Sequence, residues 1–92
     1  MATKNFKNQI NRNLYNLTAN MYFKDIPLDE IFNIVNSCEG LQVVDEAGDP
    51  WCGFLCGENS EAHFKINGAK FYLHMTWYKM DFGKWEIVAY VS

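Results

Sequence analysis

The fold is decided by residues 61–91, which read EAHFKINGAKFYLHMTWYKMDFGKWEIVAYV. Apolar and polar residues alternate through this stretch, which is typical of strands that bury one face. The alternation breaks at Asn67-Gly68 and again at residues 81–84, where turn-forming residues gather. Because both connections are short, consecutive strands are expected to pair antiparallel. The stretch therefore predicts the last three strands of an antiparallel meander.

The chemistry of the first turn predicts a register. Asn67-Gly68 is a strong signal for a two-residue type I′ turn, in which both turn residues adopt positive φ. Such a turn pairs Phe64 with Phe71 and places the neighbouring pairs at Ile66 with Ala69 and at Ala62 with Leu73.

The second turn requires one more residue. A two-residue Phe82-Gly83 loop would place Ile87 on the face opposite to the apolar row of the preceding strand. A three-residue loop over 81–83, with Gly83 in the left-handed position of a bulge, corrects this mismatch. It pairs Trp77 with Ile87, Met75 with Ala89 and Leu73 with Val91.

These registers sort the side chains into two faces. The inner face is apolar and is expected to receive the helices; it comprises Phe64, Ile66, Phe71, Leu73, Met75, Trp77, Ile87, Ala89 and Val91. The outer face carries Glu61, His63, Lys65, Tyr72, His74, Thr76, Tyr78, Glu86, Val88 and Tyr90. In this register His74 is expected to lie between Glu61 and Tyr90.

Two helices are predicted upstream of the sheet. Apolar residues recur at helical spacing over residues 3–22, at Phe6, Ile10, Leu14, Leu17 and Met21. A second helix is expected to begin near Pro27, with Asp29 and Glu30 in its first turn, and to end at residues 36–40. Its apolar stripe is Leu28, Ile31, Phe32 and Val35.

The pattern changes to period two from Leu41, with turn clusters at residues 46–50 and 57–60. This adds two strands, of which the one around residues 51–57 is apolar on both faces. The predicted fold is a single α+β domain over residues 1–92, in which two N-terminal helices pack on a five-stranded antiparallel meander sheet in two layers.

Composition restricts the class of protein. The chain has 92 residues and is 49% hydrophobic, which is too apolar for intrinsic disorder, and its apolar runs are too short to cross a bilayer. Residues 1–6 contain no apolar segment of a secretion signal. The odd number of cysteines, Cys38, Cys52 and Cys56, favours a reducing compartment. The cytoplasm is the expected location.

No motif predicts catalysis, a metal or a cofactor. The ligand types for a tetrahedral zinc site are present in Cys52, Cys56, His63, His74 and Cys38. The spacing argues against such a site, because Cys52 and Cys56 would be separated by ~13 Å along a strand, whereas two thiolates on one zinc lie within roughly 4 Å. A Glu61–His74 pair would suit acid–base chemistry, but such cross-strand pairs also form on wet sheet faces with no catalytic role. No serine elbow or phosphate-binding glycine loop accompanies them. We therefore expect a protein that is not an enzyme.

Charge is segregated along the chain, although the net charge is only −3. Nine acidic residues and no lysine or arginine lie between Asp25 and Glu61. Such a block favours a basic partner, for example a host factor that binds nucleic acid. The predicted partner-binding residues are Asp25, Asp29, Glu30, Asp45, Glu46, Asp49 and Glu58, with Trp51 as an aromatic anchor. The predicted secondary binding face comprises Tyr72, His74, Tyr78 and Tyr90.

In its size, acidity, fold class and lack of a catalytic motif, the chain resembles the small inhibitors encoded by phages and mobile elements, anti-CRISPR proteins among them. The resemblance is one of general character and carries over no residues. It implies steric inhibition, in which acidic loops occupy the surface where another protein would hold nucleic acid. Two alternatives stay open: a homo-oligomer that pairs through the tyrosine face or the C-terminal edge strand, and a binder of single-stranded nucleic acid. The acidic charge balance argues against the second.

Overall fold

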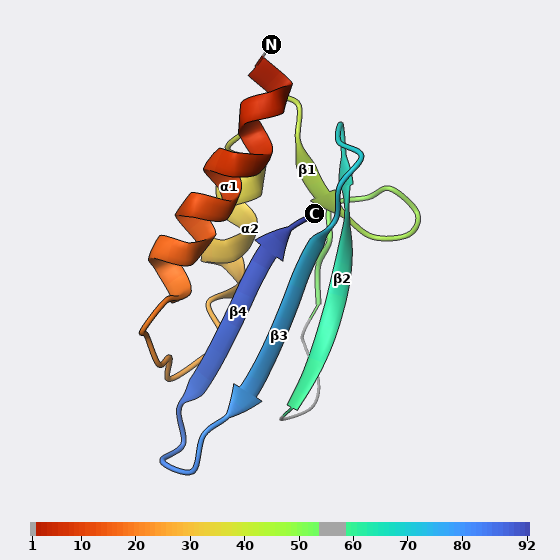
Figure 1. The fold of residues 1–92 in the computed structure, drawn as a ribbon. Coiled ribbons are helices and arrows are strands. Elements are labelled where there is room, and N and C mark those ends of the chain that lie inside the picture. Colours follow the sequence, from red (N-terminus) through yellow and green to blue (C-terminus); the bar gives the residue numbers. More distant parts are fainter. Residues whose placement is uncertain (1, 54–58) are drawn as a thin grey trace.

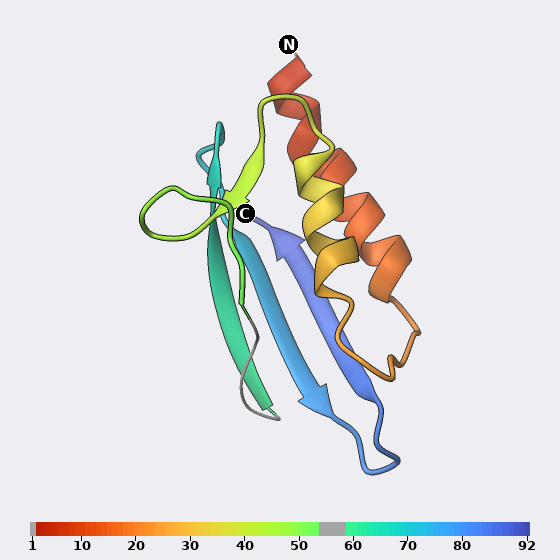
Figure 2. The same ribbon diagram turned by 180° about the vertical axis from the view of Figure 1, so that it is seen from behind.

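The structure, a computed structural model, describes residues 2–53 and 59–92. Its elements follow the order α1 (Ala2–Thr18), α2 (Leu28–Asn36), β1 (Gln42–Val44), β2 (Asn59–Asn67), β3 (Leu73–Lys79) and β4 (Trp85–Val91). Within the described residues the sheet has four antiparallel strands in the order β1-β2-β3-β4, and both helices pack on it (Figures 1 and 2). The α+β class and the antiparallel meander are confirmed.

The expectation of five strands is wrong for the described part of the chain. Trp51 and Cys52 lie outside any strand, and residues 54–58 of the expected strand lie outside the described residues. Pro50 forms a single bridge with Val44, and the Trp51 amide donates to the Val43 carbonyl beside it. The ladder goes no further, and the Val43 amide donates to the Asn36 side chain instead. Gly53, with φ at +125°, then turns the chain out of the extended conformation.

Helix α1 ends four residues earlier than predicted. Asn20 adopts the left-handed conformation with φ at 59°, which asparagine tolerates better than most residues. The chain then turns back so that Phe23 pairs with Trp85 at the start of β4. Met21, expected on the apolar stripe of the helix, is therefore 49% exposed.

Helix α2 begins and ends as predicted. Pro27 precedes it as the N-cap residue, and Asp29 and Glu30 lie in its first turn, where carboxylates stabilise the positive end of the helix dipole. Its stripe residues Ile31 and Val35 are fully buried.

The core lies between the helices and the inner face of the sheet. Ile10 and Leu14 of α1 and the stripe of α2 pack against the predicted inner row of β2, β3 and β4. Every residue of that row is buried except Phe71, which is half-buried at the margin. The predicted inner and outer faces of these strands are therefore confirmed.

The register of the second hairpin is also confirmed. Trp77 pairs with Ile87 and Leu73 with Val91. The turn closes through a hydrogen bond of 2.7 Å from the Met80 amide to the Lys84 carbonyl, which leaves a three-residue loop over 81–83. Gly83 has φ at +83°, as the bulge requires.

The register of the first hairpin is wrong by two residues. Phe64 pairs with Leu73 rather than with Phe71, because β2 continues to Asn67 and the connection then occupies residues 68–72. Asn67 does not turn, since it pairs with Gln42 of β1 on the other side of β2. A shift of two residues leaves every side chain on its predicted face but changes its cross-strand neighbour.

Gly68 sets the place where β2 ends. Its φ is +88°, and a Cβ built there would lie 2.0 Å from the Gly40 carbonyl oxygen, in the turn between α2 and β1. This backbone contact leaves no room for any side chain.

The free edge of β4 is closed at two points. Phe23 and Trp85 exchange two backbone hydrogen bonds, of 2.9 and 2.7 Å. Near the other end, the Asn11 side chain donates to the Val91 carbonyl at 3.1 Å and accepts from the Val91 amide at 2.7 Å. The amide of Asn11 thus replaces a neighbouring strand, which restricts pairing of this edge with another chain.

We predict that Gly68→Ala is far more destabilising than Gly83→Ala. At Gly83 nothing lies within 4 Å of an added Cβ. The free energy of unfolding should therefore fall only by the strain of the left-handed backbone, about 1–2 kcal/mol. At Gly68 displacement of the Gly40 backbone should add about 1–3 kcal/mol. Urea unfolding of the two variants measures the difference. Equal losses would contradict the close contact.

We predict that Asn11→Ala lowers the free energy of unfolding by about 1–2 kcal/mol, because both backbone groups of Val91 lose their partner. Asn8→Ala, at an exposed position of the same helix, should change it by less than about 0.5 kcal/mol. The Asn11 variant should also self-associate through the opened edge in sedimentation velocity. A stable and monomeric Asn11→Ala protein would show that the amide does not close the edge.

Candidate functional site

The outer face of the sheet carries several exposed aromatic side chains. Both helices lie on the opposite face (Figures 1 and 2). On the outer face Tyr72 is 48% exposed, Tyr78 and Tyr90 are each 46% exposed, and Val88 is 55% exposed. The predicted secondary binding face is thus one surface, supplied by β3, β4 and the residue before β3.

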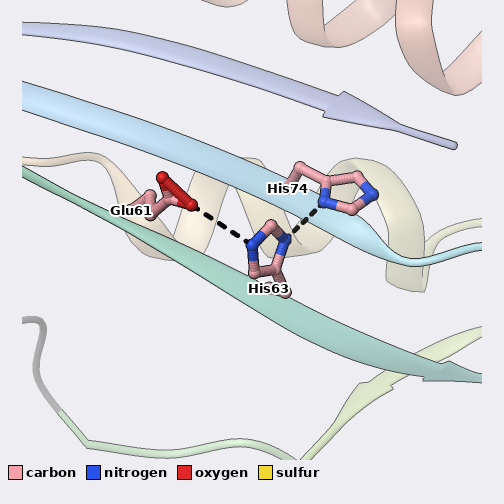
Figure 3. Close-up of polar contacts among 3 residues, drawn as sticks. All are labelled: Glu61, His63 and His74. Atoms are coloured by element: carbon pink, nitrogen blue, oxygen red, sulfur yellow. Dashed lines mark hydrogen bonds and ion pairs between the residues drawn. The ribbon is translucent and has the colours of Figure 1, made fainter.

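A histidine pair lies on this face, where β3 begins and β4 ends. The register of β2 and β3 places His63 directly opposite His74, with their Nδ1 atoms 2.5 Å apart (Figure 3). The two rings meet edge to face, with centroids 4.6 Å apart. On its other side His74 stacks on Tyr90, with centroids 5.0 Å apart and planes inclined by 24°.

The expected Glu61–His74 pair is not formed. Glu61 pairs with Thr76 across the strands, because the first hairpin is displaced by two residues. Its carboxylate lies instead 3.5 Å from Nε2 of His63, two positions along the same strand (Figure 3). The other expected neighbour of His74, Tyr90, is confirmed.

The loop over residues 45–49 is built on the side chain of Asp45. Its Oδ1 atom accepts hydrogen bonds from the amides of Ala47, at 2.9 Å, and Asp49, at 3.0 Å. Backbone hydrogen bonds from the Asp45 amide to Asp49 and from the Gly48 amide to Asp45 close the same loop. Asp45 therefore shapes the loop, while the side chains of Glu46 and Asp49 are exposed.

Trp51 packs into an aromatic cluster. Its ring meets those of Phe32 and Phe64 edge to face, with centroids 5.4 and 5.3 Å away. The side chain is half-buried, so it supports the loop and offers only part of its surface to a partner.

The remaining predicted acidic residues lie elsewhere. Asp29 and Glu30 are exposed in the first turn of α2, and Asp25 is exposed in the connection before it. The start of α2 is on the opposite side of the molecule from the 45–49 loop (Figures 1 and 2). Glu58 lies outside the described residues. The acidic block is continuous in sequence but is divided in space.

A hollow of about 470 Å³ joins the 45–49 loop to the outer face. It is lined by Val44, Asp45, Glu46, Trp51, His63, Phe64, Lys65 and Tyr72. Four of these, Val44, His63, Phe64 and Lys65, were absent from the site predicted by sequence. The outer face was predicted for His63 and Lys65, but their position beside the loop depends on the pairing of β1 with the far end of β2.

Within residues 2–53 and 59–92, no three His, Cys, Asp or Glu side chains are grouped to hold a metal ion. Burial raises the pKa of the Cys38 thiol, which keeps it protonated, and its Sγ atom lies 3.7 Å from the Ile34 carbonyl.

Neither described helix combines the length and the apolar character needed to cross a membrane.

No protein family model, curated protein or solved structure matches this chain.

We predict that Asp45→Ala lowers the free energy of unfolding by about 1–2 kcal/mol, since two loop amides lose their acceptor. Asp45→Asn retains an Oδ1 acceptor and should lose less. Urea unfolding compares the two variants, and amide hydrogen exchange at Ala47 and Asp49 reports on the loop itself. Equal protection in all three proteins would refute this role of Asp45.

Proposed function

We propose that this chain is a small cytoplasmic protein-binding module that occupies a basic surface of another protein, such as a factor that binds nucleic acid. The outer sheet face and the 45–49 loop together form the contact surface. By covering the basic surface, the module inhibits its partner sterically, as phage-encoded inhibitors such as anti-CRISPR proteins do.

The observation that carries this proposal is the hollow between loop and face, whose lining includes Glu46, Tyr72 and also Lys65. A basic side chain placed there meets a carboxylate and an aromatic ring, the two groups that best receive an arginine or lysine. Tyrosine is also enriched among the residues that dominate binding energy at interfaces. The arrangement therefore supplies both charge complementarity and an aromatic anchor.

The position of the 45–49 loop in the fold also supports this contact surface. The loop projects beside β2, and no described helix covers the face that it borders (Figures 1 and 2). The acidic residues at the start of α2 lie away from the tyrosines, so they cannot contact the same small patch of a partner. We assign the contact to the loop and the tyrosine face rather than to the whole acidic block.

The closed edge of β4 restricts the surfaces through which two copies of the chain could form a homo-oligomer. Because Phe23 and Asn11 already occupy backbone groups at both ends of that strand, a second copy would have to pair through the outer face. Direct nucleic-acid binding on this face is disfavoured by the neighbouring Glu46, Asp49 and Glu61, which repel phosphate.

We predict that reversing the loop charges with Glu46→Lys and Asp49→Lys abolishes partner capture from a cell lysate, and that Tyr72→Ala reduces capture at least ~10-fold, as loss of a hot spot does. The loop should survive, because its hydrogen bonds use the Asp45 side chain and backbone atoms of residue 49. Capture is measured by quantitative mass spectrometry at low and high salt, and high salt should weaken it.

The matched control is Asp29→Lys with Glu30→Lys, which changes charge by the same amount at the start of α2. This pair should leave capture intact. Capture that survives the loop reversal but not the α2 reversal would move the contact to the helix. Capture that survives both would refute binding through acidic residues.

A further inference from the structure

The distal nitrogens of both outer-face histidines have oxygen neighbours. Nε2 of His63 lies 3.5 Å from the Glu61 carboxylate, and Nε2 of His74 lies 3.4 Å from the Ser92 carbonyl oxygen. Neither oxygen can donate a proton, so each Nε2 is assigned as the N–H donor of its ring. In a neutral imidazole the other nitrogen is then a lone-pair acceptor.

This assignment leaves two lone pairs directed at one another. The Nδ1 atoms of His63 and His74 are 2.5 Å apart (Figure 3), and two acceptors at this distance repel unless a cation lies between them. A shared proton or a metal ion satisfies both nitrogens.

The strand geometry favours chelation. Tyr72 and Ser92 exchange two backbone hydrogen bonds, and alternation along the ladder makes His74 and Tyr90 the next hydrogen-bonded pair. The pairing of His63 with His74 is therefore of the non-hydrogen-bonded type, in which side chains approach most closely. Two imidazoles fixed in this way form a bidentate donor set.

The surroundings match those of metal-ligating histidines. Such histidines usually donate their second N–H to a carboxylate or a backbone carbonyl, which are the two groups found here. The nitrogens must separate to about 3.3 Å to accommodate tetrahedral bonds of about 2.0–2.1 Å. The His63 side chain is 55% exposed, so its ring has room to make this small movement.

We propose that His63 and His74 form a two-histidine site for a borderline divalent transition metal, Cu²⁺ or Zn²⁺, bound through both Nδ1 atoms. Glu61 positions His63 and the Ser92 carbonyl positions His74. The remaining ligands are water or a donor group of a bound molecule, because no third described side chain converges on the two nitrogens. The site is independent of the proposed function, since it concerns a metal rather than a basic protein.

The test is isothermal titration calorimetry of the full chain with CuCl₂ and, separately, with ZnCl₂. Beyond any binding to the thiols, we expect one saturable histidine-dependent site, with Cu²⁺ tighter than Zn²⁺ as the general stability order requires. His63→Gln and His74→Gln should each abolish this site. Glu61→Gln should weaken it by about 10- to 100-fold, as loss of a second-shell partner does. All variants retain the same three cysteines, so binding to thiols is common to every titration.

A second readout uses the unaltered protein. Nitrogen NMR of its imidazoles with ZnCl₂ should shift Nδ1 of both histidines on coordination and leave both Nε2 atoms protonated. Metal binding at thiols only, with unchanged Nδ1 resonances, would overturn the proposal. A shared proton only, with no metal bound, would overturn it as well. Neither result bears on partner capture, which the loop reversals test separately.

Discussion

Gly68 approaches the backbone of Gly40 so closely that even a methyl group is excluded between them, and the rest of the sheet is arranged around this contact. It joins the turn after α2 to the end of β2. Because β2 must reach that point, Asn67 stays in the strand and pairs with β1. The next connection is lengthened, and the cross-strand neighbours of β2 on β3 follow from its length.

Local sequence signals were sufficient wherever the structure depends on neighbouring residues. The stripes of α2 and the sheet, the two faces and the Gly83 bulge all follow from spacing and turn chemistry. The local signals failed where contacts between distant segments determine the structure. The Asn67-Gly68 pair favours a tight turn by itself, but β1 and Gly40 override that preference. Asn20 likewise ends α1 early, so that Phe23 can pair with a strand more than sixty positions away.

The same distinction applies to the candidate site. Tyr72, Tyr78 and Tyr90 were placed on one exposed face from alternation alone. Of the two predicted neighbours of His74, Tyr90 was correct and Glu61 was wrong. Alternation specifies the face on which a side chain lies, whereas the register specifies its cross-strand neighbour. The acidic block illustrates a second limit of prediction from sequence. Its residues follow one another along the chain, but the fold divides them between the start of α2 and the 45–49 loop. Only the loop adjoins the tyrosines.

The side-chain amide of Asn11 bonds to Val91 across 80 positions of the chain. In folding, α1 gains this anchor only when β4 is in place beside β3. A contact of such high sequence separation closes slowly, because much of the chain must be ordered before its two ends can meet.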